Sequence, residues 1–291
     1  MRIIFSYTLL FLVYGVAFVL PAILLPVSAT MNAPGAGTSW RFFVILIFNF
    51  TFLTYLINRL NARGITLCLH IILIIWGLQT FMTQIETWYF REAMANLDYH
   101  ELINLFIRPL LTACLFVPIA VGVIGKWKSL KPEKKDIHTP WPWKSISLLA
   151  LGYVLIYFVF GYFVAWQFEA IRVFYTGSAV KVDFFESLMN TATTDPGLYM
   201  FQILRGALYA LLGTFLSHHL GGSKAEKLIF TTLLYALLPS ILLIIDNPFM
   251  PAEVRLAHFI ELTSSNGLFG LLIGLQSENK PELIPAGTPS D

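Results

Sequence analysis

Long apolar segments recur along the whole chain and are separated by shorter polar stretches. Most are close to the roughly 20 residues that an α-helix needs to cross a bilayer core of about 30 Å. Only 12% of the 291 residues are charged, whereas a soluble domain has about 25%. The sequence therefore predicts an all-α integral membrane protein with about eight transmembrane helices. We expect these helices at residues 3–25, 42–58, 65–87, 103–125, 145–166, 198–217, 228–246 and 255–275.

The first apolar segment has features of both a signal peptide and a membrane helix. Arg2, an apolar run and Val27-Ser28-Ala29 follow one another in the order of a secretory signal. The apolar core of a signal peptide is usually about 7–15 residues long, and this run is longer, about 20 residues. We therefore expect residues 1–29 to be retained, with cleavage as the alternative.

Positive charges divide unevenly between the two sides that eight crossings create. One side receives both termini and the connections 59–64, 126–144 and 218–227, which together hold nine of the ten lysines but three of the nine arginines. Cytoplasmic loops carry an excess of lysine and arginine. The sequence thus predicts cytoplasmic N and C termini, and the short loops suit a cell inner (plasma) membrane.

Two connections on the opposite, outer side are longer than simple turns. Residues 88–102 and 167–197 combine aromatic and charged residues with helical spacing, so we expect interfacial helices in both. The polar segment 277–291 contains three prolines and is expected to be a disordered cytoplasmic tail. Residues 1–276 then form one polytopic helical membrane domain.

The last apolar segment carries a stripe of polar residues. Arg255, His258, Glu261 and Asn266 fall on one side of a helix and descend about 16 Å along it. Such residues are costly in hydrocarbon and usually mark a functional site. His258 with Glu261 or Glu86 would form a general-base pair that activates water, so these three are the candidate catalytic residues.

Arginines predominate among the outer cations, where six arginines accompany one lysine. A guanidinium offers paired donors to a carboxylate or phosphate, which lysine does not. Polar faces in lipid turn towards one another, so we expect an arginine-rich polar chamber in the outer leaflet. Gln79 and Glu86, spaced i and i+7, should share a face in it. The candidate substrate-binding residues are Arg108, Arg205, Arg255, Gln202, Asn266 and Gln79. Alternatively, the outer arginines simply pair with the outer carboxylates.

Several kinds of site find no support in the sequence. It has no HExxH or Cys/His cluster, no Walker loop, no GxSxG and no GxGxxG that follows a strand. We therefore expect no metal and no cofactor. The net charge of +2 gives no reason to expect nucleic acid as a partner. The expected partners are the lipid bilayer and an anionic lipid or lipid-linked substrate, and no protein partner is predicted.

The favoured function is binding of an anionic lipid headgroup, a lipid-linked substrate or a small anionic substrate in this chamber. Three alternatives remain open: an intramembrane hydrolase or transferase, a solute transporter, and a structural or assembly subunit. The inner halves of the apolar segments are almost purely apolar. This pattern favours a one-sided site over a channel.

Overall fold

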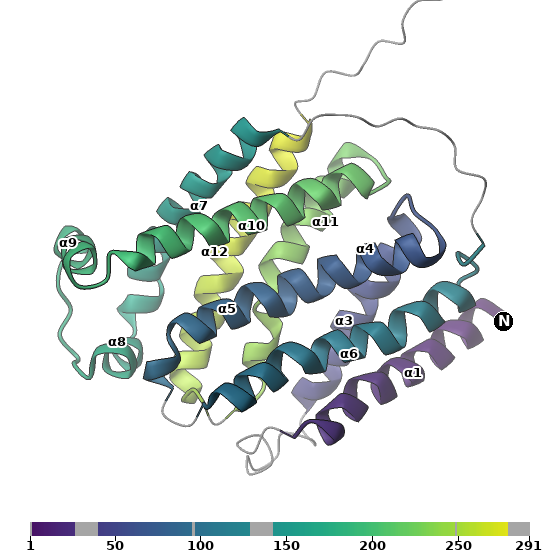
Figure 1. Ribbon diagram of the computed structural model, residues 1–291, viewed down its shortest axis with the longest axis horizontal. Coiled ribbons are helices and arrows are strands. Elements are labelled where there is room, and N and C mark those ends of the chain that lie inside the picture. The colour runs from purple at the N-terminus through teal and green to yellow at the C-terminus, as the bar shows by residue number, and fades with distance from the viewer. Residues whose placement is uncertain (1, 27–39, 95–96, 129–141, 248, 279–291) are drawn as a thin grey trace, which may run out of the picture.

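The fold was obtained as a computed structural model, which describes residues 2–26, 40–94, 97–128, 142–247 and 249–278. All regular elements in these ranges are helical (Figure 1). Within these ranges, seven helical segments are long and apolar enough to cross a membrane, which agrees with a multi-pass helical membrane protein. They are α1 (Arg2–Leu24), α3 (Trp40–Arg59), α4 (Gly64–Trp76) continuing through η1 (Gly77–Phe81) into α5 (Met82–Tyr89), α6 (Tyr99–Val123), α7 (Trp143–Phe163) with η3 (Ala165–Gln167), α10 (Gly197–His219) and α12 (Ala252–Glu278).

The seventh expected segment, residues 228–246, is not one continuous helix, and this prediction was wrong. Its first part is α11 (Lys224–Leu237), and after a turn the 3-10 helix η4 (Ile241–Ile244) follows. Pro239 explains the break, because proline lacks an N–H and its ring clashes with the carbonyl four residues earlier. Both pieces pack on α12, and α11 lies alongside it in Figure 1.

Three connections predicted to share one side of the membrane meet at one end of the bundle, which we call the basic end. Asn61 donates from its backbone N–H to the His219 carbonyl (2.8 Å), and Gly221 donates to the Arg59 carbonyl (2.8 Å). Gly64 donates to the Lys126 carbonyl (2.9 Å), which joins the start of α4 to the chain after α6. Most of the predicted lysine-rich connection, residues 129–141, lies outside the described residues.

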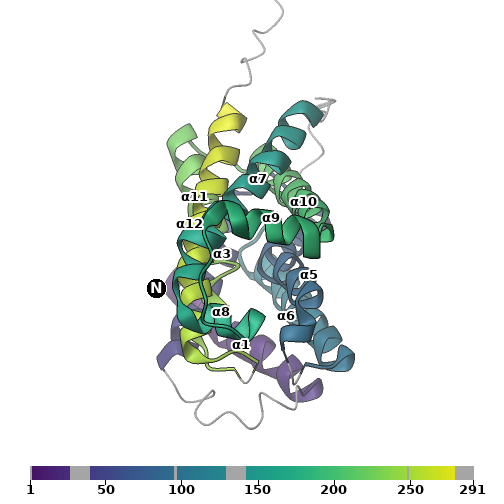
Figure 2. The ribbon, with the colours of Figure 1, turned by 90° about the vertical axis from the view of Figure 1, so that its left-hand side faces the viewer.

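The opposite end, which we call the loop end, carries the longer connections. The expected helices in residues 167–197 are α8 (Glu169–Thr176) and α9 (Phe184–Thr194). Figure 2 looks at this end and shows both in front of the long helices. In residues 88–102 the only surface helix described is the 3-10 turn η2 (Arg91–Ala93), and α6 starts early, at Tyr99. Asp98 caps α6 by accepting the Glu101 N–H (2.7 Å).

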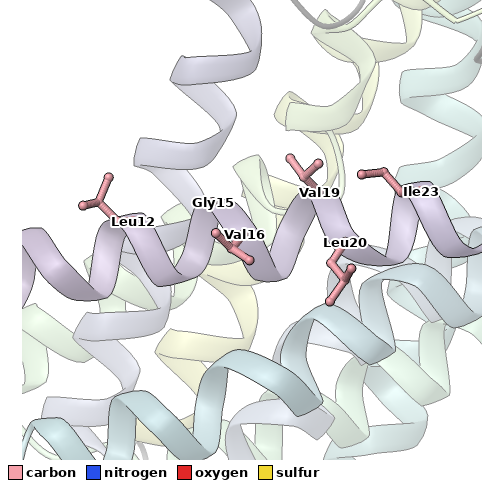
Figure 3. A pocket seen from close by; sticks show the side chains of 6 residues that line it. All are labelled: Leu12, Gly15, Val16, Val19, Leu20 and Ile23. Atoms are coloured by element: carbon pink, nitrogen blue, oxygen red, sulfur yellow. The ribbon is translucent and has the colours of Figure 1, made fainter.

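Large apolar side chains face outwards along the bundle, as lipid-facing side chains do. Helix α1 buries Leu10 and Tyr14 in the core, yet exposes Phe5 and Ile23. A shallow apolar hollow follows its outer face (Figure 3). At the other end of the chain, α12 continues to Glu278, slightly beyond its expected end, and the remainder of the expected disordered tail lies outside the described residues.

Candidate functional site

Glu86 of α5 and Arg205 of α10 form a paired ion bridge at the loop end of the bundle. Arg205 donates from Nη1 to Glu86 Oε1 (2.6 Å) and from Nη2 to Oε2 (2.7 Å). Gln202, one turn earlier on α10, accepts a further bond from Arg205 Nη1 at 2.9 Å. Arg205 is only 1% exposed. A buried guanidinium of this kind is stable only with a carboxylate beside it, because desolvating a single charge costs several kcal/mol.

Aromatic rings surround the Arg205 guanidinium. Its central carbon lies 5.8 Å from the ring of Tyr153, 5.7 Å from Phe201 and 6.0 Å from Tyr209. Gly206 lets α10 approach α7 here, because a Cβ at this position would lie 2.7 Å from the Tyr153 Cβ. Ring faces attract cations, so this cage adds to the stabilisation by Glu86.

A second polar group runs from α8 to α12. The Tyr175 hydroxyl lies 3.0 Å from His258 Nε2, and His258 Nδ1 lies 3.6 Å from Glu261 Oε2. Ser265 donates to the other Glu261 oxygen at 3.4 Å. Burial raises the pKa of Tyr175, so its hydroxyl stays protonated and is able to donate to Nε2. With Nε2 as the acceptor, the imidazole proton would lie on Nδ1, which faces Glu261.

Helix α8 holds Tyr175 over α12 through an apolar contact. Ile171 is fully buried and belongs to one apolar cluster with Val254 and Ala257 of α12. Tyr175 follows Ile171 by four residues, so both side chains lie on the same face of α8. The sequence analysis missed Tyr175, although this i, i+4 spacing within an expected surface helix was the available signal.

The two polar groups lie at the same end of the bundle, on α5, α8, α10 and α12. We define the loop-end polar cluster as Glu86, Tyr175, Gln202, Arg205, His258 and Glu261. Arg205 balances the charge of Glu86, and Glu261 lies beside His258 within this cluster.

Arg108 lies elsewhere, at the junction of α6 and α1. Its Nε donates to the Leu25 carbonyl (2.6 Å), and its Nη2 donates to the Ala22 carbonyl (3.0 Å). These carbonyls belong to the C-terminal end of α1, which has no helical N–H partners for its last turn. The described contacts of Arg108 thus tie α1 to α6, and its predicted role in substrate binding stays a prediction.

Arg255 lies one turn before His258 on α12 and bonds to acceptors at the start of that helix. It forms an ion pair with Asp246 and donates from Nη1 to the Met250 carbonyl (2.9 Å). Arg41 at the start of α3 also contacts Asp246, at 3.1 Å. Asp246 was not predicted as a site residue, although it opens the polar turn before α12.

Gln79 and Glu86, which were expected to share a helix face, bond to residues of different helices. Gln79 donates to Asn49 of α3 at 2.9 Å, while Glu86 pairs with Arg205 of α10. Gln79 lies within the π-helical turn η1 at Gly77–Phe81, which takes more residues per turn than an α-helix. A π-helical turn gives no clear signal in an apolar sequence.

Asn266 is 1% exposed, and neither amide atom has a hydrogen-bond partner among the described residues. The Gln202 Nε2, the Arg205 Nε and the Tyr209 hydroxyl also lack a hydrogen bond of good geometry. Asn266 precedes Phe269 by one turn, and the Phe269 ring packs 5.1 Å from that of Tyr153. Unsatisfied buried polar atoms of this kind are uncommon and are typical of a place that water or a ligand occupies.

Other kinds of site gain no support from the geometry. Among the described residues, no three His, Cys, Asp or Glu side chains are grouped to hold a metal ion. The hollows on α1 and on α3 are apolar, and neither is lined by residues of the loop-end polar cluster.

Comparison with protein-family models, with curated proteins and with solved structures found no match to this chain.

Proposed function

We propose that this chain is a multi-pass plasma-membrane enzyme, a hydrolase or transferase, that acts on the polar part of a lipid or lipid-linked substrate at the loop-end polar cluster. The observation that carries the proposal is the Tyr175–His258–Glu261 chain of contacts beside the buried Glu86–Arg205 pair. A histidine oriented by a carboxylate and able to lose or gain one proton is a suitable general base. The His258 side chain is 19% exposed, so a substrate group has access to it.

His258 Nε2 is the proposed base, and Glu261 is the group that orients it. Tyr175 now occupies Nε2, at the place where the O–H of water or of a substrate hydroxyl would lie during reaction. In the proposed step that O–H bond breaks, its proton moves to Nε2, and the oxygen attacks the substrate. Glu261 stabilises the resulting imidazolium, which then returns the proton to the leaving group.

Charge balance favours this proposal over a clamp for an anion at Arg205. Glu86 already neutralises Arg205, so an added anion would leave the cluster with excess negative charge. Burying an unbalanced charge is strongly unfavourable. A one-sided site is also favoured over transport, because the face of α12 below Asn266 continues with Phe269 and Ile273, both buried and apolar.

A structural role is the second candidate, and one observation favours it. Arg108, Arg205 and Arg255 each bond to acceptors of the protein itself. In that case the polar residues would only tie helices together, as interhelical hydrogen bonds do in membranes.

The test compares wild type with His258→Gln, each in nanodiscs made from a natural membrane lipid extract. His219→Gln is the matched control, because His219 lies at the basic end. We expect mass spectrometry to show one lipid consumed by wild type and by the control, but not by His258→Gln. Unchanged lipids in all three samples, or consumption that survives in His258→Gln, would overturn the proposal.

The proposed orientation places both termini and the basic end in the cytoplasm. Single cysteines at Asn61 and at Thr193, in a chain with Cys68 and Cys114 replaced by alanine, report on the two ends. A membrane-impermeant maleimide should label Thr193→Cys in intact cells and Asn61→Cys only after lysis. The reverse pattern would contradict the orientation.

A further inference from the structure

An apolar hollow runs along the outer face of α3. It is lined by Val44, Ile47, Phe48, Thr51 and Phe52 and has a volume of about 260 Å³. On each side of the hollow along α3, a contact joins this helix to α11 or to the turn that follows η4. Towards the basic end, the ring of Tyr55 stacks on Phe230 of α11 at 4.2 Å. At the loop end, Arg41 pairs with Asp246, which follows η4.

Arg41 stands at the loop end of this hollow. Arg41, Val44 and Phe48 are spaced i, i+3 and i+7, so they lie on one face of α3. The Arg41 side chain is 40% exposed. Trp40 beside it is 70% exposed, and tryptophan is enriched at membrane–water interfaces. The hollow thus starts at an interfacial cation and continues into the apolar part of the bundle.

The charge at this position is not fully balanced. Arg41 and Arg255 both use one oxygen of Asp246, Oδ1, so two guanidinium groups share one carboxylate. Arg255 is 7% exposed, and its Nε has no hydrogen-bond partner. Glu253 is exposed, and its position two residues before Arg255 places it on a different side of α12. Two arginines with spare donors are well suited to a phosphate.

The dimensions fit one lipid chain. From Arg41 to Phe52 the helix rises about 16 Å at about 1.5 Å per residue. That is close to half of a bilayer core of about 30 Å, the depth that one acyl chain occupies. A free phosphate would use the arginines but would leave the hollow empty.

We propose that Arg41 and Arg255 hold the phosphate of an anionic phospholipid whose acyl chain lies in the hollow of α3. The proposal is independent of the enzymatic one, since none of these residues belongs to the loop-end polar cluster. Lipid bound here would join α3 to the start of α12.

The test is native mass spectrometry of protein released from nanodiscs that contain equal amounts of phosphatidylglycerol and phosphatidylcholine. Wild type should retain phosphatidylglycerol selectively. Loss of one charge-assisted bond, worth about 1.5 kcal/mol, should lower its retention about tenfold in Arg41→Gln. Arg91→Gln, which removes another arginine of the loop end, is the matched control and should retain the lipid.

A second variant distinguishes lipid from free anion. Ile47→Trp fills the hollow and leaves both arginines in place, so it should also lower phosphatidylglycerol retention. Displacement of the lipid by inorganic phosphate, or full retention in Ile47→Trp, would assign the arginines to an anion without a chain and overturn the proposal. Equal retention of both lipids, or none, would overturn it as well.

Discussion

The two ends of the bundle are held together in different ways. At the basic end, short connections bond backbone to backbone, as between Asn61 and His219, and the ion pair of Arg59 with Glu226 is partly exposed. At the loop end, long connections bring side chains together, and the Arg205 charge is buried against Glu86. Backbone bonds satisfy groups that every sequence has, whereas buried ion pairs add a desolvation cost. The basic end is thus joined mainly through the backbone, whereas the loop end depends on particular side chains.

The largest expected effect comes from breaking the buried pair. Arg205→Ala leaves Glu86 without its cation, and the free energy of unfolding should fall by about 3–5 kcal/mol. Arg59→Ala breaks the partly exposed pair at the basic end and should cost much less, because solvent screens that pair. Thermal unfolding in detergent measures both. The double variant Glu86→Leu with Arg205→Met should recover most of the loss, and equal losses for the two single arginine variants would contradict the difference between the ends.

Close packing beside Arg205 should give the next largest effect. In Gly206→Ala the new Cβ would lie 2.7 Å from the Tyr153 Cβ and 2.8 Å from the Ala150 carbonyl oxygen. Overpacking of this kind typically costs about 1–3 kcal/mol. Gly15→Ala on α1 is the control, because no atom lies within 4 Å of its added Cβ. Thermal unfolding should show a loss for Gly206→Ala only, and an unchanged midpoint there would mean that α7 and α10 are not in tight contact.

A smaller effect is expected from the hydroxyl that contacts the proposed base. Tyr175→Phe removes the bond to His258 and should lower stability by about 0.5–1.5 kcal/mol. The variant also frees Nε2, so His258 should react faster with diethyl pyrocarbonate, as followed by peptide mass spectrometry. Tyr7→Phe removes an exposed bond to Asn58 near the basic end and is the matched control. Unchanged reactivity of His258 in Tyr175→Phe would show that the hydroxyl does not cover the base.

Hydrophobic length predicted most of the fold, because membrane helices must satisfy their backbone groups internally. The pairing of Glu86 with Arg205 was foreseen in general terms, as convergence of polar faces or as pairing of outer arginines with outer carboxylates. The specific partners were not foreseen, since 119 positions separate the two residues. Gln79 lies within the π-helical turn at Gly77–Phe81, and Pro239 broke the seventh segment. The proline is visible in the sequence, and its effect was missed because the apolar run continues past it.

The residues of the candidate polar contacts that sequence reasoning missed are aromatic or lie in turns. Tyr175 comes from a short surface helix, and Asp246 from the turn before α12. Their importance depends on which helices lie opposite them, and a single sequence contains that information only indirectly. His258 and Glu261 were predicted as site residues because polar residues at helical spacing inside an apolar segment are rare, and their role stays a prediction.

The smallest expected effect is a difference in how the two ends respond to pH. At the basic end, the hydrogen bond from Tyr55 lowers the pKa of Glu226, and Arg59 adds to this. A lowered pKa stabilises the fold above the unfolded value of about 4.3 and ceases to do so as pH falls through the folded value. At the loop end, burial raises the pKa of Tyr175, which stabilises the fold below about pH 10 and is lost as pH rises.

Thermal midpoints between pH 3 and pH 11 test this difference. Glu226→Gln should weaken the acid dependence alone, and Tyr175→Phe should weaken the alkaline dependence alone. The midpoints of wild type and Glu226→Gln should converge as the pH falls through the lowered pKa of folded Glu226. If Glu226→Gln instead changed the thermal midpoints at alkaline pH, the two ends would be coupled through the helices. The two ends would then not respond to pH independently.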